Sequence, residues 1–485
     1  MLFCAKYREW LDLKQQNVSK KRVLLMAKLT VAVGMIIISL LIMGCSGHPR
    51  EKNKILAQNS KISPEDEAFL DTLQHRSFQY FLKEINRANG LVRDRSTADA
   101  PASIAATGFA LPVWAVGAER GWISRHQAAE LTFTCLNFLW NAEHSADSLA
   151  NGYRGFFYHF LEMNSGKRTW NCELSSIDTA LLLAGARFTA QYFHRNNPLE
   201  KQIRALADSL RFRVDWNWMT LPDRGKYAGT ISLGWRPEKG FIPIGWVGYN
   251  EALILYIIAA GSGFENAANA YQKWLSFYDW REPYPGVGLV SFPPLFGHQY
   301  SHMLVDFRGL PDAYMRKKGI DYFENSRRAV WVQRQYAIEN PNGWTGYDSL
   351  CWGLTACDGP GPDYNFDQRE FFWYTARGVS GPDLLRNDDG TIAPTAAAAS
   401  IAFAPELVLP TLKSLYKRYG DRGLWGPYGF RDAFNPTINW FDKDYLGIDQ
   451  APIVLMIENF RSGMIWRYAM RDSIIQKGLE ILEFK

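Results

Sequence analysis

Six strongly apolar stretches recur along this chain at nearly regular spacing, and no other feature constrains the fold as much. Their apolar residues follow helical periodicity, and successive starts lie roughly seventy residues apart, with a shorter last gap. The stretches begin near Ser103, Ile177, Tyr249, Asp321, Pro394 and Ala451. The helices between them, such as residues 199–214 and 405–419, are amphipathic and suit an outer layer. Six buried helices that alternate with six half-buried ones predict an all-α fold, the (α/α)6 toroid.

A helical-repeat solenoid is the nearest alternative to this toroid, but its repeats are shorter and more alike in sequence. Strand-like alternation is scarce, with residues 155–163 as an example, so we expect only small hairpins on loops. In a toroid the inner helices run parallel, so the loops that precede them share one rim. We call this the N-terminal rim, and we expect the polar residues before the inner helices to converge there.

The first 62 residues are interpreted separately from the folded domain. Residues 29–43 form an apolar run that follows a basic segment and ends at Gly44-Cys45, which is typical of a signal peptide with a bacterial lipobox. We predict a signal peptide over residues 1–45, a flexible tether over residues 46–62 and one domain over residues 63–485. Met26 is an alternative start, in which case residues 1–25 are not translated. A buried helix or an uncleaved membrane anchor is the alternative interpretation.

An acylated Cys45 predicts a secreted lipoprotein of the outer membrane, on its periplasmic or surface face, that contacts the membrane only through the lipid anchor. The first 45 residues contain seven of the 54 basic residues but only two of the 49 acidic ones, so 47 of each remain. The mature chain is neutral, and we expect no nucleic-acid partner. We expect a monomer.

The cysteines and the chemical motifs exclude several classes of enzyme. Cys135, Cys172, Cys351 and Cys357 remain after the leader, and we expect buried single thiols, with a Cys351–Cys357 pair as the alternative. The sequence contains no C-x-x-C pair, G-x-S-x-G turn, P-loop or G-x-G-x-x-G turn. We therefore expect no metal, no cofactor and no serine nucleophile.

Carboxylates occur before nearly every predicted inner helix. They are Asp94, Glu173, Asp178, Glu251, Asp306, Asp358, Asp388, Asp389 and Asp449. Glycosidic cleavage needs two carboxyl groups, one that protonates the leaving oxygen and one that activates water or attacks the sugar. Burial among aromatic residues raises the pKa of the acid. Each carboxylate also has a structural interpretation, because Asp and Glu stabilise helix N-termini in any protein.

Sugar rings stack on aromatic side chains, and sugar hydroxyls bind carboxylates, amides and Arg. We therefore assign substrate binding to the polar and aromatic residues of the predicted rim, namely Arg93, Asp94, Arg95, Glu173, Tyr249, Asn250, His298, Gln299, His302, Arg308, Trp352, Asp358 and Trp440. His298 and His302 have the spacing of a metal pair on a helix, but no third ligand is evident. Sugar binding or packing is the better interpretation of these two histidines.

Long motifs in these loops resemble a known family. They are GLVRDRS (residues 90–96), SIAATGFAL (103–111), ELSSIDTALLLAG (173–185), GYNEALILY (248–256), FGHQYSHMLVDFRG (296–309), DYFENSRRA (321–329), CDGP (357–360), DDGTIAPTAA (388–397) and YLGIDQAP (445–452). The chain from about residue 65 onward resembles the glucoamylase-like proteins of Bacteroidetes, grouped with glycoside hydrolase family 144. One departure is Ala451, where relatives tend to have Gly.

This resemblance implies an (α/α)6 toroid that cleaves β-1,2-linked glucans internally and inverts the anomeric carbon. It implies catalytic roles for Asp178, Glu251 and Asp449. Our first hypothesis is therefore an inverting endo-β-1,2-glucanase, with Glu251 or Asp178 as the acid and Asp449 ordering water or substrate. The alternatives are the same scaffold acting on another glycan, as an exo-glycosidase, a glucoamylase-type enzyme or a lyase, or a lipid-anchored glycan-binding protein without activity.

Overall fold

The computed structural model describes residues 62–485. The predicted signal peptide, the lipidation site Cys45 and nearly all of the predicted tether lie outside the described residues. Among the helices that are described, none has both the length and the apolar character needed to cross a membrane.

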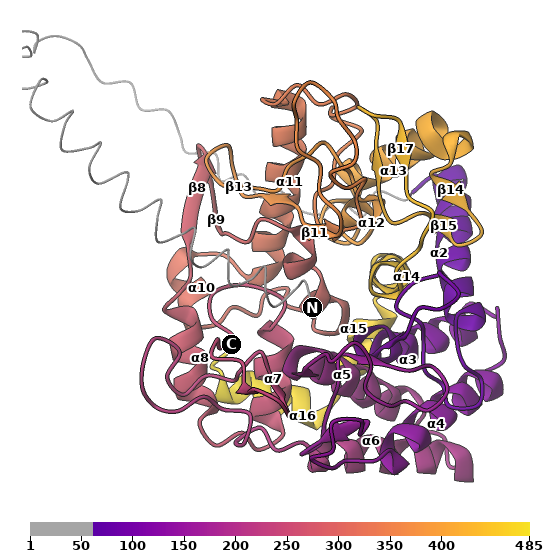
Figure 1. The fold of residues 1–485 in the computed structure, drawn as a ribbon, viewed down its shortest axis with the longest axis vertical. Helices are drawn as coiled ribbons and strands as arrows, with labels where there is room; N and C mark the ends of the chain where they lie inside the picture. The colour runs from indigo at the N-terminus through magenta and orange to yellow at the C-terminus, as the bar shows by residue number, and fades with distance from the viewer. Residues whose placement is uncertain (1–61) are drawn as a thin grey trace, which may run out of the picture. The chain divides into compact units, whose positions relative to one another are not determined.

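Residues 68–485 form an all-α (α/α)6 toroid, as predicted, with two layers of helices around a common axis (Figure 1). The inner helices are almost entirely buried: α3 (Ile104–Glu119), α5 (Ser176–Tyr192), α7 (Leu253–Gly261), α9 (Tyr300–Leu304), α12 (Pro394–Ala398) and α14 (Gly447–Ser462). The outer helices are α2 (Pro64–Lys83), α4 (Arg125–Asn141), α6 (Pro198–Arg213), α8 (Ala267–Leu275), α11 (Tyr322–Glu339) and α13 (Pro405–Tyr419). Shorter helices complete the chain: η1 (Leu295–His298), α10 (Ala313–Lys318), η2 (Gly420–Arg422), α15 (Met464–Ala469) and α16 (Ser473–Ile481).

The fourth inner helix is not where the apolar pattern predicted it. The sequence predicted an inner helix near Asp321, but α11, which begins there, buries Tyr322, Ala329 and Val330 on one side and leaves Arg327 and Arg328 partly exposed on the other. This one-sided burial is typical of an outer helix. The inner position is taken by α9, whose five residues are all buried. The α9 segment contains Ser301 and His302, so it lacks the strongly apolar run by which the other inner helices were predicted.

Serine caps begin three of the long helices, α3, α4 and α5. The hydroxyl oxygen of Ser103 accepts a hydrogen bond from Ala106 N at the start of α3, and Ser124 forms a capping box with Gln127 at the start of α4. At the start of α5, Ser175 Oγ accepts a hydrogen bond from Asp178 N at 3.2 Å. This cap fixes Asp178 in the first turn of an inner helix, on the N-terminal rim.

The backbones of α3 and α5 meet at two glycines. A Cβ atom at Gly185 would overlap the carbonyl oxygen of Gly108, and a Cβ atom at Gly108 would overlap the backbone of Leu182. The absence of side chains at this crossing lets the two inner helices approach more closely than larger residues would allow. The crossing brings the N-terminal ends of both helices to the same rim.

The strands are short and lie on loops, as predicted. Antiparallel pairs join β1 (Ala102–Ser103) to β4 (Phe160–Leu161), β2 (Gly152–Tyr153) to β3 (Phe156–Phe157), β8 (Trp280–Tyr284) to β9 (Val287–Val290), β10 (Ala356–Cys357) to β11 (Thr375–Ala376), β12 (Gly378–Val379) to β13 (Leu385–Arg386), β14 (Trp425–Gly426) to β15 (Gly429–Phe430) and β16 (Phe434–Asn435) to β17 (Trp440–Phe441). One sheet has three strands, β5 (Leu174–Ser175), β6 (Gly234–Arg236) and β7 (Gly240–Phe241), and its register pairs Leu174 with Trp235. These ladders hold the loops of the N-terminal rim.

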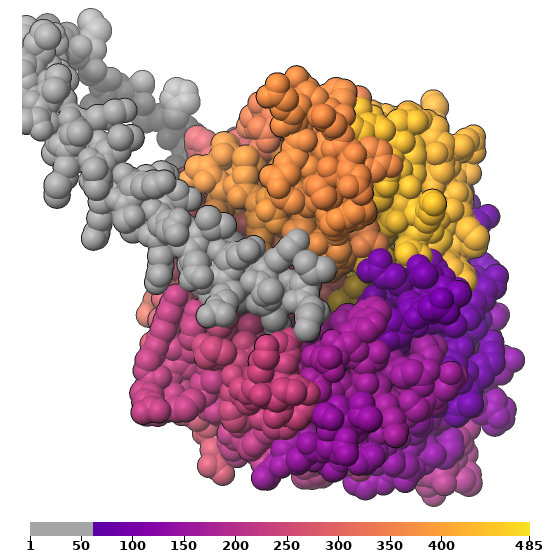
Figure 2. All heavy atoms as spheres, in the orientation of Figure 1, coloured from indigo at the N-terminus to yellow at the C-terminus, as the bar shows by residue number. Residues whose placement is uncertain are grey.

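The first outer helix, α2, packs against the hairpin of β14 and β15, and this contact closes the ring. Phe69 of α2 packs against Trp425 of β14 with ring centroids 6.5 Å apart, and Arg76 donates a hydrogen bond to the carbonyl oxygen of Gly426 at 2.9 Å. The indigo N-terminal surface and the yellow C-terminal surface accordingly adjoin (Figure 2). The four described cysteines, Cys135, Cys172, Cys351 and Cys357, are buried free thiols, which confirms that interpretation.

Candidate active site

His159, on the loop before β4, is the centre of the first half of the site. Its Nδ1 lies 3.2 Å from Glu173 Oε1 and 3.7 Å from Asp178 Oδ2. Arg236 of β6 donates to the other oxygen of Glu173 at 2.8 Å. Although burial opposes the charged form, Asp178 and Glu173 raise the pKa of His159 to about 9, so the imidazole is cationic at neutral pH.

Glu173 and Asp178 respond differently to this cation. Burial works to raise the pKa of Glu173, but the hydrogen bond and charge of His159, together with Arg236, hold that pKa well below its ordinary value. The pKa of Asp178 is raised by burial even though the charge of His159 lowers it. Asp178 Oδ2 is buried and has no hydrogen-bond partner among the described residues. Glu173 is therefore a fixed anion, whereas Asp178 has an oxygen available for a ligand.

Glu251 lies beside this group, directly before α7. It follows Asn250, whose Oδ1 accepts a hydrogen bond from Ala252 N at 2.9 Å and so holds the turn that leads into the helix. The carboxyl is buried, and its Oε2 has no hydrogen-bond partner among the described residues. Burial, together with the charge of Asp178, raises the pKa of Glu251 to about 7. Glu251 is therefore able to hold or release a proton near neutral pH.

The second half of the site consists of carboxylates around Asp449, in the first turn of α14. Burial raises the pKa of Asp449 to about 7. Burial and the charges of Asp449 and Asp358 raise the pKa of Asp432 well above its ordinary value. Burial and the charge of Asp432 raise the pKa of Asp442 to about 8. Carboxylates this close cannot all ionise, so the group retains protons at neutral pH.

Arg95 supplies the positive charge for this second half. Its Nη1 lies 2.7 Å from Asp358 Oδ2 and 3.9 Å from Asp444 Oδ2, and its Nε lies 3.4 Å from Asp94 Oδ2. Asp358 N in turn donates a hydrogen bond to Asp432 Oδ2 at 2.7 Å. Loops that are far apart in the sequence, before α3, before α12 and before α14, are thus joined on one rim.

The two halves of the site meet at Tyr300 of α9. Burial raises the pKa of its hydroxyl well above the ordinary value, and the charges of Asp449 and Glu251 raise it further. Tyr374, on the loop after Asp358, is affected in the same way by burial and by Asp449 and Asp432. The predicted carboxylates Asp178, Glu251 and Asp449, with Glu173, Asp94, Arg95 and Asp358, therefore belong to one connected electrostatic site.

Several residues predicted to bind substrate lie instead in the core. His298 Nε2 lies 3.0 Å from the carbonyl oxygen of Phe292, His302 Nε2 lies 3.1 Å from Ser326 Oγ, and Gln299 donates to Ser400 Oγ at 2.8 Å. Burial lowers the pKa of His298 to about 4 and that of His302 to about 3, so both are neutral. These contacts bind η1 and α9 to their neighbours. The helix spacing that suggested a polar face here reflects buried polar packing.

Tyr249 and Trp352 also face the core. The Tyr249 ring stacks on Tyr322 of α11 with centroids 5.6 Å apart. Trp352 is buried and donates from Nε1 to Thr411 Oγ1 of α13 at 2.9 Å. Trp440, by contrast, is half-buried in β17 and packs against the small cluster that contains Cys357.

Two predicted arginines do not join the carboxylates. Arg308 follows the C-terminal end of α9, so it lies at the opposite end of the inner layer, where it pairs with Asp306 at 2.7 Å and packs over Trp466. Arg93 lies 3.7 Å from Glu84 and donates to the carbonyl oxygen of Thr97. Arg95 pairs with Asp94 and Asp358, whereas Arg93 is held by Glu84 and by the loop at Thr97.

Asp358, Asp432 and Asp442 each place one carboxylate oxygen within 4.8 Å of the others, the one group with metal-ligand spacing among the described residues. Such oxygens suit a hard cation. The guanidinium of Arg95, 2.7 Å from Asp358, already compensates part of this negative charge.

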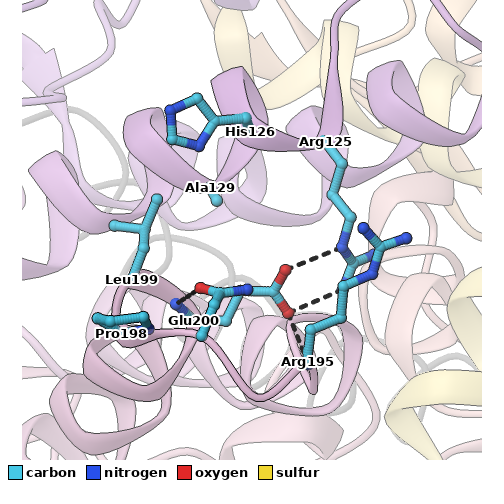
Figure 3. Close-up of a pocket in the computed structure, with 8 residues that line it drawn as sticks. Arg125, His126, Ala129, Arg195, Pro198, Leu199 and Glu200 are labelled. Atoms are coloured by element: carbon cyan, nitrogen blue, oxygen red, sulfur yellow. Dashed lines mark hydrogen bonds and ion pairs between the residues drawn. The ribbon is translucent and has the colours of Figure 1, made fainter.

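A surface pocket between α4 and α6 is separate from this site (Figure 3). It is lined by Arg125, His126 and Glu200, among others, and its centre is an ion pair in which Arg125 Nε lies 3.0 Å from Glu200 Oε1. Both residues lie near the N-terminal ends of outer helices, which run antiparallel to the inner ones. The pocket is therefore on the opposite side from the N-terminal rim.

Sequence reasoning missed His159, Arg236, Asp432 and Asp442. Asp432 and Asp442 lie in the loop before α14, which already contained the predicted Asp449, so attention to the whole loop would have found them. His159 and Arg236 lie beside short strands, and only pairing between distant loops brings them to the rim.

The helical toroid that carries this carboxylate-lined rim is shared with known proteins. Residues 243–473 match the glycoamylase family, whose description reads "Putative glucoamylase". A solved protein of that description from Bacteroides uniformis is 34% identical, covers 88% of this chain and 98% of its own, and has a TM-score of 0.75. The endo-β-1,2-glucanase of Chitinophaga pinensis, solved with sophorotriose and glucose, is 30% identical, with coverage of 87% and 99% and a TM-score of 0.73.

This chain belongs to the glucoamylase-like family of Bacteroidetes. A further relative is the exo-β-1,2-glucooligosaccharide sophorohydrolase of Parabacteroides distasonis, 29% identical over 451 residues, which cover 86% of this chain. This chain spans only 58% of the length of that curated relative.

Proposed function

We propose that this protein is a glycoside hydrolase that cleaves β-1,2-glucan. The observation that carries the proposal is Glu251, a buried carboxyl on the N-terminal rim whose pKa is raised to about 7 and whose Oε2 has no hydrogen-bond partner within residues 62–485. Asp178 and Asp449 lie in the first turns of two other inner helices, and the Oδ2 atom of each likewise has no hydrogen-bond partner in the described part of the chain. The β-1,2-glucan substrate is supported by the activities in the names of the two characterised relatives.

Glu251 is the proposed general acid. No cation in the part of the chain that the structure describes lowers its pKa, so burial keeps its proton until a glycosidic oxygen takes it. Asp178 is less suited to this role, because the cationic His159 beside it favours the ionised form. Asp178 accepts a hydrogen bond from a sugar hydroxyl or from water and increases the proton affinity of Glu251.

Asp449 is the proposed base that activates or orders water. The protonation of Asp432 is coupled to that of Asp449, so Asp432 is placed to receive a proton from Asp449. Asp432 also accepts a hydrogen bond from Asp358 N. Separate acid and base groups at the two halves of the site fit single displacement with inversion. The anomer released first, measured by NMR during hydrolysis, tests inversion.

Internal cleavage is the proposed mode, since the Chitinophaga relative is matched over almost its whole length. Release of sophorose from the non-reducing end is the second candidate, favoured by the Parabacteroides relative. The test is digestion of linear β-1,2-glucan with analysis of product length over time. Endo action gives a ladder of oligosaccharides at early times, whereas exo action gives only the disaccharide.

The same digestion, extended to α-1,4-, β-1,3- and β-1,4-glucans, tests substrate linkage. Release of reducing ends from β-1,2-glucan alone supports the proposal. Release from another glucan instead would assign the scaffold to that linkage. Tight binding of β-1,2-glucan without release of reducing ends would indicate a glycan-binding protein. Such a protein does not need carboxyls that hold protons near pH 7.

A further inference from the structure

Trp170 lies in a turn that is unusual for a tryptophan. Cys172 N donates a hydrogen bond to the carbonyl oxygen of Thr169 at 3.2 Å, which closes a four-residue turn with Trp170 and Asn171 at its centre. Both central residues have positive φ angles, 56° and 48°. Such turns favour Gly, Asn and Asp, because a larger side chain crowds the backbone in the left-handed region. Asn171 suits the turn, but Trp170 does not.

The Trp170 side chain gains little from the fold in return for this backbone conformation. It is 56% exposed, and its one ring contact with a described residue is a tilted one with Phe160, with centroids 5.0 Å apart. The turn itself is held firmly, because Thr169 N donates to the carbonyl oxygen of Phe160 at 3.2 Å and Phe160 N donates to Cys172 Sγ at 3.3 Å. The structure thus holds a large apolar surface toward solvent in a fixed position. A costly conformation that gives no core packing indicates a function.

The position of Trp170 connects it to the carboxylate site. Phe160, which it contacts, stacks on His159 with centroids 4.0 Å apart and planes 11° apart. His159 Nδ1 is 3.7 Å from Asp178 Oδ2. The turn is followed directly by β5 and then by α5, so it lies on the N-terminal rim. Two stacked aromatic and imidazole rings separate Trp170 from the carboxylate that contacts the substrate.

We propose that Trp170 is a stacking platform for a glucosyl unit outside the pair of sugars at the cleaved bond, and that it sets a preference for longer chains. The inference rests on the proposed function. The apolar C–H face of a glucose ring packs on an indole ring, and an exposed indole on a hydrogen-bonded turn requires no rearrangement of the backbone on binding. A contact this far from the reacting bond is equal in ground state and transition state, so it lowers KM and leaves kcat unchanged.

Trp170→Asn separates binding from folding, because Asn adopts the left-handed conformation more readily than Trp. The variant should have a Tm equal to or higher than that of the wild type. Its KM for long β-1,2-glucan should rise about tenfold with kcat unchanged, the loss expected for one stacked ring. For a disaccharide, which fills only the two positions at the cleaved bond and so cannot reach Trp170, KM should not change. Trp170→Tyr, which keeps an aromatic face, should restore part of the affinity for long chains.

Trp140→Ala is the matched control, since Trp140 is a partly exposed tryptophan on outer helix α4 that packs against Arg213. It should leave KM unchanged for every chain length. If the wild type is active but Trp170→Asn has the same KM for long chains, the inference is overturned and the proposed function stays intact. The same holds if the KM of Trp170→Asn rises equally for short and long chains. A wild type that releases no product from β-1,2-glucan overturns the proposed function, and with it the glucosyl ligand assigned to Trp170.

Discussion

Nδ1 of His159 lies 3.7 Å from Oδ2 of Asp178, and that oxygen has no hydrogen-bond partner among the described residues. The imidazole is held at this distance by Glu173, which is itself held by Arg236. His159 therefore places a positive charge beside Asp178 but forms no hydrogen bond with its Oδ2 atom. This makes His159 a positioning residue, one that maintains the charge and orientation of the carboxylate that we propose to contact the substrate.

Replacing His159 by Gln should expose this role in the pH dependence of stability. The folded-state pKa of about 9 exceeds the ordinary value of 6.5, so the charged imidazole stabilises the fold fully below pH 6.5 and this contribution is lost as the pH rises through 9. The wild type should therefore exceed His159→Gln in unfolding free energy by on the order of 2 kcal/mol at pH 6, and by much less at pH 10. Urea unfolding at several pH values measures this difference.

His126→Gln is the control for that series, because His126 is exposed on α4 and pairs only with Glu130. Its stability relative to the wild type should not vary with pH by more than a few tenths of a kcal/mol. An equal pH profile for both histidine variants would show that His159 is not charged by its carboxylate neighbours.

Glu251→Gln should be more stable than the wild type in neutral and alkaline solution. Burial raises the pKa of Glu251 from 4.5 to about 7, so ionisation of the folded protein penalises the wild type as the pH rises from 4.5 to 7. Over this interval the difference in unfolding free energy should move in favour of the Gln variant by about 2–3 kcal/mol. Thermal or urea unfolding at pH 4.5 and pH 8 tests it, and a difference that does not change with pH would contradict the raised pKa.

Gly185→Ala should destabilise the toroid, because the added methyl group meets the carbonyl oxygen of Gly108 where α3 and α5 cross. Overpacking of this kind costs about 1–3 kcal/mol. Ala205→Ser, which adds one atom on the exposed side of α6, serves as the control and should change stability by less than about 0.5 kcal/mol. Equal stability of the two variants would mean that the crossing can relax.

Cys45→Ala should release the protein from the membrane fraction, since the lipobox pattern at Gly44-Cys45 predicts acylation of that thiol. Fractionation of cells that express each form, followed by immunodetection, measures the change. Cys135→Ala, which alters a buried thiol of α4, should leave the distribution as in the wild type. Full membrane retention of the Cys45 variant would argue against a lipid anchor.

The sequence predicted the helical toroid because five of the six inner helices carry a periodic or capped signal that depends only on local residues. It misplaced the fourth, because α9 contains Ser301 and His302 and lacks a strongly apolar run, so its burial is decided by its neighbours. The sequence predicted that Asp178, Glu251 and Asp449 share one rim because each lies just before or within the first turn of an inner helix. It could not distinguish these from His298 and His302, whose polar atoms face Phe292 and Ser326 in the core, because the direction of a side chain depends on tertiary packing.

No sequence pattern indicated His159, again because its contacts depend on tertiary packing. Nothing in the alternating segment around it distinguishes this histidine from a loop residue. Its role arises from the pairing of β4 with β1 and of β5 with β6, which brings Glu173, Asp178 and Arg236 around it. Contacts between loops that are distant in sequence leave no local pattern to read.

The central claim is that carboxylates of the N-terminal rim hydrolyse β-1,2-glucan, and kcat of Glu251→Gln and Asp178→Asn on this substrate tests it most directly. Both changes keep side-chain size, and circular dichroism at the assay temperature checks that the variants are folded. Each should lower kcat by about a hundredfold or more, the usual contribution of a positioned acid–base group. Glu130→Gln, an exposed carboxylate of α4, should retain wild-type kcat. Folded Glu251 and Asp178 variants that hydrolyse the glucan at the wild-type rate would contradict the account, because these residues would then be only helix-terminal structure.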